Sequence, residues 1–345
     1  MLPILIIGQG IAGTMLAHHL MKAGQNVVAL DEMGLTMSSR VAAGLYNPVT
    51  GKRMIKTWLA DELFPYALKV YHELEEELDI NVIQDRNVYK PYRDVAEQND
   101  LLAKSSDKRF NGYLNTDFDS TSFSGLVDDD FGGTEVLQAG NIELNPLLNA
   151  FRKKLMQNDS LIEEAFDEKL LNGTNYKGVD YQKVILCQGA DAMNNDLFNW
   201  LPFSPTKGEI LEVTIDNFPN THIVSKGFFI LPKTENRFVV GSTYELKIDG
   251  GVTEKGLNQL KNKLDGLLKV PYEVVKHKFG IRPTVRDRRP FVGVHPERKN
   301  VYIFNGFGTK GVTLSPYFAN EFVNYLLNGD TINKEANIER YYSLY

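Results

Sequence analysis

Residues 3–32 read PILIIGQGIAGTMLAHHLMKAGQNVVALDE, and this stretch decides the fold class. A short apolar run over residues 5–7 leads into a glycine-rich turn, and a helical pattern follows over residues 15–22. A second apolar run, residues 27–30, comes next and stops at an acid. Strand, glycine turn, helix, strand and acid in this order are typical of the βαβ unit that binds dinucleotides.

The glycine turn has the spacing G-x-G-x-x-G, with Gly8, Gly10 and Gly13 at its fixed positions. In such a unit the first glycine allows a tight turn, the second lets the backbone approach a pyrophosphate, and the third lets helix and strand pack closely. The helix N-terminus adds free N–H groups and a positive dipole end. We therefore expect these glycines and the intervening Ala12 to bind the pyrophosphate of a dinucleotide.

Asp31, at the end of the second apolar run, is placed to accept both ribose hydroxyls of an adenosine. An acid at this point disfavours NADP, which usually needs a basic residue for its 2′-phosphate. NAD and FAD both remain compatible with this unit, so the rest of the chain has to distinguish them.

Composition excludes several classes of protein. The 345 residues carry a formal net charge of −6, which disfavours extended contact with a nucleic-acid backbone. The one cysteine, Cys187, allows no disulfide within the chain, so we expect a cytoplasmic location. The N-terminal apolar run is too short for a signal peptide, and no run approaches the ~20 apolar residues of a membrane span. No Cys/His cluster has metal-ligand spacing, and we expect no metal site.

The rest of the chain alternates helical and strand patterns. A buried strand is expected at residues 183–187, and the alternation over residues 206–245 indicates antiparallel strands. Residues 301–328 repeat the order strand, glycine turn and helix. Helical periodicity is present in three further stretches: residues 61–80, 141–157 and 254–268.

These patterns predict an α/β protein in which a Rossmann-like dinucleotide-binding domain is interrupted by an antiparallel, β-rich α+β substrate domain. We assign residues 1–80, 136–205 and 281–345 to the first domain, and residues 81–135 and 206–280 to the second. Ligands in open α/β sheets bind at the carboxyl ends of the strands, so we expect the site in the crevice between the two domains.

Five blocks of sequence resemble, in the same order, the D-amino-acid-oxidase-like family of FAD-dependent oxidoreductases. This family includes glycine oxidase, monomeric sarcosine oxidase and the flavin domain of a bifunctional tRNA-modifying enzyme. The first block is the dinucleotide unit, and the others are SSRVAAGLYNP (38–48), VILCQGADA (184–192), GFFILPK with RFVVGSTYE (227–245), and GIRPTVRDRRPFVG with NGFGTKGVTLSP (280–316).

The resemblance implies an enzyme that binds FAD and oxidises the C–N bond of an amino acid or secondary amine. Hydride passes to the flavin, and the resulting imine is hydrolysed. Cys187 does not lie where sarcosine oxidases attach flavin, so FAD is expected to be non-covalent. Besides the first unit, the resemblance places these residues at the cofactor: Ser38, Ser39, Arg40, Gly44, Leu45, Gly189, Gly308, Lys310, Gly311 and Val312.

The resemblance also implies residues that hold the substrate. Arg282 matches the arginine that binds the substrate carboxylate, and the alternative is a structural ion pair, for example with Asp287. Arg53 and Lys56 resemble a stretch that covers the flavin and reaches the substrate. Tyr244 is a further candidate for the catalytic site.

Four aromatic residues could wall the substrate cavity, although each is also compatible with ordinary core packing: Tyr46, Trp58, Phe228 and Tyr244. Two departures concern the electron acceptor. Where sarcosine-oxidase-like enzymes have an oxygen-activating lysine and a nearby histidine, this chain has Val239 and Thr243. The sequence leaves open oxygen or another acceptor, the identity of the substrate and the oligomeric state.

Three alternatives remain at this point. The chain could be a flavoenzyme that removes a carboxymethyl group from a modified tRNA uridine, although its acidic charge makes a nucleic-acid partner a weaker expectation. It could be a flavin-binding module without catalysis. An NAD-dependent dehydrogenase would leave the last four blocks unexplained.

Overall fold

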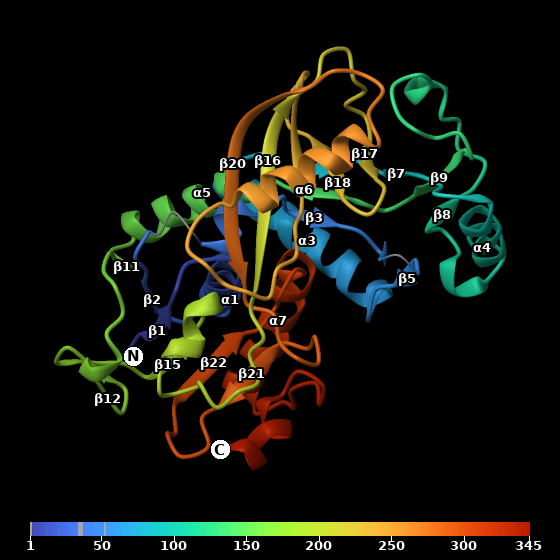
Figure 1. The fold of residues 1–345 in the computed structure, drawn as a ribbon. Coiled ribbons are helices and arrows are strands. Elements are labelled where there is room, and N and C mark those ends of the chain that lie inside the picture. The colour runs from blue at the N-terminus through green and yellow to red at the C-terminus, as the bar shows by residue number, and fades with distance from the viewer. Residues whose placement is uncertain (1, 34–36, 52) are drawn as a thin grey trace.

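The computed structural model describes residues 2–33, 37–51 and 53–345. Figure 1 shows two main sheets, one in the lower half of the view and one that extends from it toward the top right. Within the described residues, no helix combines the length and the apolar character that crossing a membrane requires.

The first sheet has six strands and is parallel except at one edge. Its two faces are covered by different segments, because successive residues of a strand point to opposite sides. Ile4 and Ile6 pack with the helices α1 and α7, whereas Leu5 and Ile7 pack with residues of the 166–201 segment and the C-terminus. The strand order is β11 (Leu161–Ile162), β2 (Val27–Leu30), β1 (Ile4–Ile7), β15 (Lys183–Leu186), β22 (Val301–Asn305) and the antiparallel β21 (Phe291–Val294).

The second sheet has eight strands, and all its pairs are antiparallel except β17 with β7. Helix α6 (Glu254–Asp265) covers one face of β16 with Leu260 and Leu264. The strand order is β20 (Glu273–Arg282), β16 (Thr206–Thr214), β19 (Arg237–Gly241), β18 (Phe229–Pro232), β17 (Ile223–Ser225), β7 (Val88–Pro91), β9 (Gly133–Val136) and β8 (Leu114–Asn115).

Smaller elements connect and flank these sheets. The remaining helices are α1 (Ile11–Lys22), α2 (Ser38–Val41), α3 (Ala60–Leu78), α4 (Val95–Ser105), α5 (Leu144–Gln157) and α7 (Gly311–Asn328), with 3₁₀ turns at 108–110, 121–123, 168–170, 189–194 and 338–344. The remaining strands are β3 (Leu45–Tyr46), β4 (Val49–Thr50), β5 (Ile55–Lys56), β6 (Ile83–Asp85), β10 (Gly140–Ile142), β12 (Leu171–Asn172), β13 (Asn175–Tyr176) and β14 (Val179–Asp180).

The predicted α/β fold class is confirmed, and the helices that were predicted begin and end close to the expected residues, whereas α2 and α4 were not predicted. The largest difference is α1, which begins at Ile11 rather than Met15. This helix is buried on nearly every side over residues 11–20, so its first turn lacks the alternation of polar and apolar residues that marks an exposed helix. The division into two domains at the stated boundaries stays a prediction.

Candidate functional site

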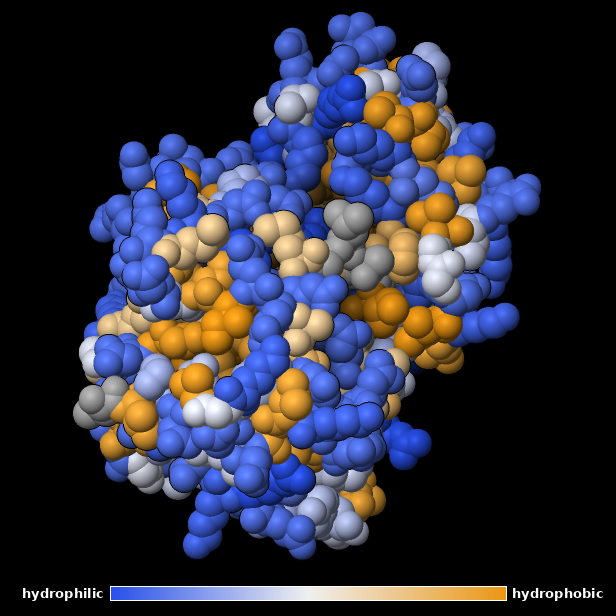
Figure 2. Space-filling view, turned by 90° about the vertical axis from the view of Figure 1, so that its left-hand side faces the viewer, coloured by the Kyte–Doolittle hydropathy of each residue, from blue (hydrophilic) through white to orange (hydrophobic). Residues whose placement is uncertain are grey.

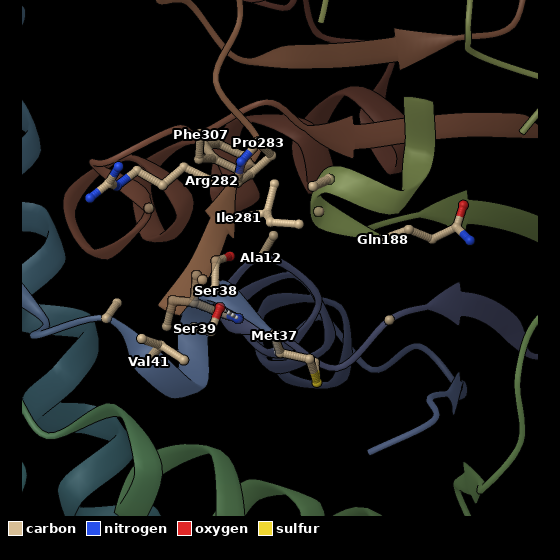
Figure 3. Close-up of a pocket in the computed structure, with 18 of the residues that line it drawn as sticks. Ala12, Met37, Ser38, Ser39, Val41, Gln188, Ile281, Arg282, Pro283 and Phe307 are labelled. Atoms are coloured by element: carbon tan, nitrogen blue, oxygen red, sulfur yellow. Dashed lines mark hydrogen bonds between the residues drawn. The ribbon is translucent and has the colours of Figure 1, made fainter. Parts of the chain in front are cut away.

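A cavity of about 700 Å³ lies between the two sheets. It is bounded by the carboxyl ends of β1, β2 and β15, by the start of α7, and by β16 and β20. Figure 2 shows apolar atoms in orange where the upper and lower parts of the molecule meet. In Figure 3 Arg282 and Gln188 lie on opposite sides of the view, with Ala12, Ser38 and Ser39 between them.

The glycine turn after β1 forms one wall of this cavity. Gly8 has φ +101°, a backbone conformation that favours glycine, and a Cβ at position 13 would lie 1.9 Å from the Gly8 carbonyl oxygen. Gly10 lines the cavity as the N-cap of α1, and as a glycine it has no side chain to cap the helix. The Ile11 N–H donates to Ser39 Oγ at 3.1 Å. The turn therefore brings backbone N–H groups and a helix N-terminus to the cavity, as a pyrophosphate requires.

Asp31 lies at the end of β2, where it lines the cavity although only 5% of its surface is exposed. Its Oδ1 accepts from the Gln9 N–H at 2.7 Å, and its Oδ2 accepts from Arg152 Nη1 at 2.7 Å. Sequence reasoning missed Arg152, because the two residues are 121 positions apart. The Asp31 carboxylate is therefore held in place by two donors within the protein.

Residues 38–45 form another part of the cavity wall, beside the first turn. Gly44 has φ +72°, and a Cβ there would lie 2.0 Å from the Ile142 carbonyl oxygen. Arg40, although it belongs to α2, does not line the cavity, because its Nη1 donates to Asn149. The expected cofactor residues that do line it are Gly8, Gly10, Ala12, Asp31, Ser38, Ser39, Gly44, Leu45, Gly189, Gly308, Gly311 and Val312.

Lys310 begins α7 but its side chain turns away from the cavity. Its Nζ donates to Thr57 Oγ1 at 3.1 Å, and burial lowers the pKa of its amine to about 8. The backbone around it, at Gly308, Gly311 and Val312, lines the cavity instead. The turn can therefore stabilise an anion with N–H groups and without the lysine side chain.

Arg282 ends β20 and reaches the cavity from the second sheet. Its Nη2 donates to Ser242 Oγ at 2.7 Å and to the Thr243 carbonyl oxygen at 3.2 Å, while its buried Nη1 has no partner among the described residues. Burial lowers the pKa of this guanidinium. Asp287, the alternative partner, instead pairs with Arg340 at 3.0 Å.

Other expected substrate residues lie off the cavity wall. Arg53 is exposed, with its carbonyl accepting from Lys104 Nζ, and Lys56 pairs with Asp61. Tyr244 is 57% exposed, and its ring lies 5.8 Å from the Arg282 guanidinium, so it contacts the arginine from outside. None of these three lines the cavity, and their roles stay predictions.

The four aromatic candidates for the cavity wall also lie elsewhere. Tyr46 is buried and donates to Asp85, Trp58 stacks on Phe318, and Phe228 belongs to the core of the second sheet. Phe229, the neighbour of Phe228, lines the cavity instead, because adjacent residues in extended chain point in opposite directions. Gly208, Ile210 and Ser242 also line it and were missed, although the alternation of 206–214 carried that information for Gly208 and Ile210.

Cys187 is a free, buried cysteine at the end of β15. Burial raises the pKa of its thiol, as expected for an unreactive cysteine.

The comparisons with known proteins concern the family and the fold of this chain. A family described as FAD dependent oxidoreductase (DAO) matches residues 3–324. An uncharacterized oxidoreductase, YurR, of Bacillus subtilis is 25% identical over 95% of this chain and 95% of that protein. Glycine oxidase of Bacillus subtilis is 30% identical over 39% of this chain and 36% of that protein.

Two solved structures share the fold. Glycine oxidase of Bacillus cereus has a TM-score of 0.78 and 20% identity, with 96% of each chain covered. Iminodiacetate oxidase of Chelativorans sp. has a TM-score of 0.76 and 21% identity, with 98% of each chain covered. The tRNA-modifying bifunctional protein MnmC of Legionella pneumophila is 25% identical over 97% of this chain, which spans only 54% of that protein.

Proposed function

This chain belongs to the family of FAD dependent oxidoreductases, and we propose that it oxidises the C–N bond of a small amino acid or secondary amine that carries a carboxylate. The product is an imine that water hydrolyses. The names of two related proteins, glycine oxidase and iminodiacetate oxidase, support a substrate of this class.

One observation carries the proposal: Arg282 is a half-buried cation at the cavity wall, and its buried Nη1 has no counter-ion among the described residues. No Asp or Glu of the described residues forms an ion pair with it, and its Nη1 has no partner there. A buried, unpaired charge is costly, and a planar guanidinium fits a carboxylate with two parallel hydrogen bonds. A substrate carboxylate therefore supplies the missing partner.

The wall around Arg282 favours a small substrate. Ile210 and Phe229 contribute apolar side chains, and Gly208 contributes none. Apolar walls exclude water from the reacting carbon, while the single cation fixes one end of the substrate. We infer that a glycine-sized or proline-sized amino acid fits better than one with a long charged side chain.

FAD supplies the two-electron acceptor, and the residues of the first sheet hold it. Asp31 and the glycine turn would hold the adenosine and pyrophosphate of FAD, and the N–H groups at the start of α7 would stabilise negative charge on its flavin. Among the described residues that line the cavity beside Arg282, none is a histidine, lysine or carboxylate that could serve as a general base. The amine therefore has to bind in its neutral form, and activity should rise with pH as free substrate loses its proton.

The test is an anaerobic absorption titration of the FAD-loaded protein with glycine, sarcosine, D-alanine and L-proline. We expect the flavin band near ~450 nm to bleach with at least one of them. The Arg282→Met variant should keep FAD and need a much higher substrate concentration, and Arg282→Lys should recover part of the loss. Readmitting oxygen, or adding an artificial acceptor, then identifies which one reoxidises the flavin.

A flavin that binds but bleaches with none of these compounds would overturn the proposal. The tRNA-modifying alternative would then be tested with a carboxymethylaminomethyl-uridine nucleoside. A flavin that bleaches with that nucleoside alone would favour the tRNA-modifying reaction, and one that never bleaches would favour a binding module.

A further inference from the structure

Arg152 is a buried cation that the proposed function does not use. It lies on α5 with 4% of its side chain exposed, and it does not line the cavity. Its Nη1 donates to Asp31 Oδ2 at 2.7 Å, and its Nη2 donates to Glu163 Oε1 at 2.8 Å. The guanidinium therefore joins the ribose end of the cavity to an acid at the surface, whose side chain is 55% exposed.

The two donors on Asp31 fix its carboxylate in one plane. The Gln9 N–H holds Oδ1, and Arg152 holds Oδ2, both at 2.7 Å. Gln9 is itself fixed, since its Nε2 donates to Thr14 Oγ1 at 3.0 Å and to the Leu148 carbonyl oxygen at 3.1 Å. An ionised carboxylate has about four acceptor sites, so two remain for the hydroxyls of a ribose.

Charge compensation is the second contribution of Arg152. Asp31 is 5% exposed, and a carboxylate buried without a cation is strongly destabilising. Arg152 is the one cation that the structure places in an ion pair with Asp31 among the described residues. Both of its Nη atoms are already engaged, so this arginine is not free to hold a 2′-phosphate.

We propose that Arg152 is a positioning residue for the adenosine half of FAD. It orients and neutralises Asp31, which accepts the ribose hydroxyls, and it acts through Asp31 rather than by touching the cofactor. The inference rests on the proposed role of Asp31, and it does not depend on which substrate the enzyme oxidises.

The experiment measures binding to the apoprotein of FAD by fluorescence quenching, of ADP by competition, and of FMN as a probe that lacks adenosine. We expect Arg152→Met to weaken the binding of FAD and of ADP by the same factor, about tenfold or more. The affinity for FMN should stay within about twofold of the wild-type value. Arg152→Lys should recover part of the loss. Glu163→Gln is the matched control, since it removes only the surface partner, and it should bind like the wild type.

A double-mutant cycle separates positioning from a general effect on the fold. Asp31→Asn alone should weaken FAD binding, and adding Arg152→Met to it should cause little further loss of FAD affinity. If the two factors by which FAD affinity falls multiply in the double variant, or if FMN binding weakens as much as ADP binding, the proposal is overturned. An unchanged FAD affinity in Arg152→Met also overturns it.

If Arg152→Met alone fails to fold, the double variant, which removes both charges, and Arg152→Lys are compared with the wild type instead. Because these readouts are binding constants, a protein that oxidises no amine would leave the result intact.

Discussion

The guanidinium of Arg282 occupies the space that a side chain at position 208 would need. A Cβ on Gly208 would lie 1.9 Å from Arg282 Nη2 and 2.3 Å from its Cζ. The two residues are diagonal neighbours on paired strands, since Gly208 pairs with Gly280, two residues before Arg282. The absence of a side chain at position 208 therefore determines where the cation can lie.

Gly208→Ala should displace Arg282 and weaken substrate binding while FAD binding stays unchanged. A methyl group cannot share this space with the guanidinium, so we expect KM to rise about tenfold or more. Steady-state kinetics and an FAD titration measure both effects. Gly250→Ala is the control, since a Cβ there meets nothing within 4 Å. Equal KM values in the two variants would contradict this account.

Ser242→Ala should remove one of the two acceptors that hold Arg282. Nη2 would keep the Thr243 carbonyl at 3.2 Å and lose the Ser242 hydroxyl at 2.7 Å. Because a hydrogen bond to a charged group contributes about 1.5–3 kcal/mol, we expect KM to rise about tenfold and kcat to change little. Ser242→Thr keeps the hydroxyl and should behave like the wild type. A drop in kcat at constant KM would show that Ser242 acts on the chemical step instead.

Lys310→Met should stabilise the fold at neutral pH. Burial lowers the pKa of this amine from 10.5 to about 8, so the folded state resists protonation more than the unfolded chain does. The resulting loss of folding stability is complete below pH 8 and disappears as the pH rises to 10.5. The variant should therefore be more stable at pH 7 by up to ~3 kcal/mol and lose this advantage near pH 10.5.

Urea unfolding of both proteins at pH 7 and 10 measures this difference. FAD affinity should change less than about threefold, because the side chain turns away from the cavity. If the variant exceeds the wild type in free energy of unfolding by the same amount at both pH values, protonation of the Lys310 amine does not cause the difference.

His19 should make the protein less stable in mild acid. Burial lowers its pKa from 6.5 to about 4, and its neutral ring contacts the Met15 carbonyl oxygen and the Tyr66 hydroxyl. At pH 5 the ring takes up a proton when the protein unfolds. The contribution of the neutral ring to folding stability is therefore complete above pH 6.5 and is lost as the pH drops toward 4. At pH 5 the loss relative to pH 7 should be about 2 kcal/mol.

His19→Gln should lose less stability between pH 7 and 5 than the wild type, as measured by urea unfolding. His72→Gln is the control, since that ring is 63% exposed. If the His72 variant removes the same pH dependence, the acid sensitivity does not come from burial of His19.

Part of the cavity wall follows from local sequence. Gly8, Gly10 and Asp31 lie within one βαβ unit, and the spacing of their neighbours determines how that unit folds. Local sequence was not sufficient for Lys56. Its ion-pair partner Asp61 is only five residues away, but the sequence pattern does not reveal that the two side chains pair. A charge in a motif gives no information about whether a nearby acid already neutralises it.

Phe228 and Phe229 show a second limit. Both are apolar and adjacent, and only one of them lines the cavity. Which face of a strand is buried against the core depends on how the neighbouring strands pair, and a shift of one residue exchanges the two faces.

The sequence by itself determined the fold class, the family and the glycine turn that lines the cavity, since these depend on residues that are close along the chain. Tertiary structure decided that Arg152 holds Asp31 from 121 positions away, and that Gly208 leaves the space in which Arg282 lies. Both relationships join segments through long-range packing, where the distance between side chains depends on strand register and helix placement rather than on sequence spacing.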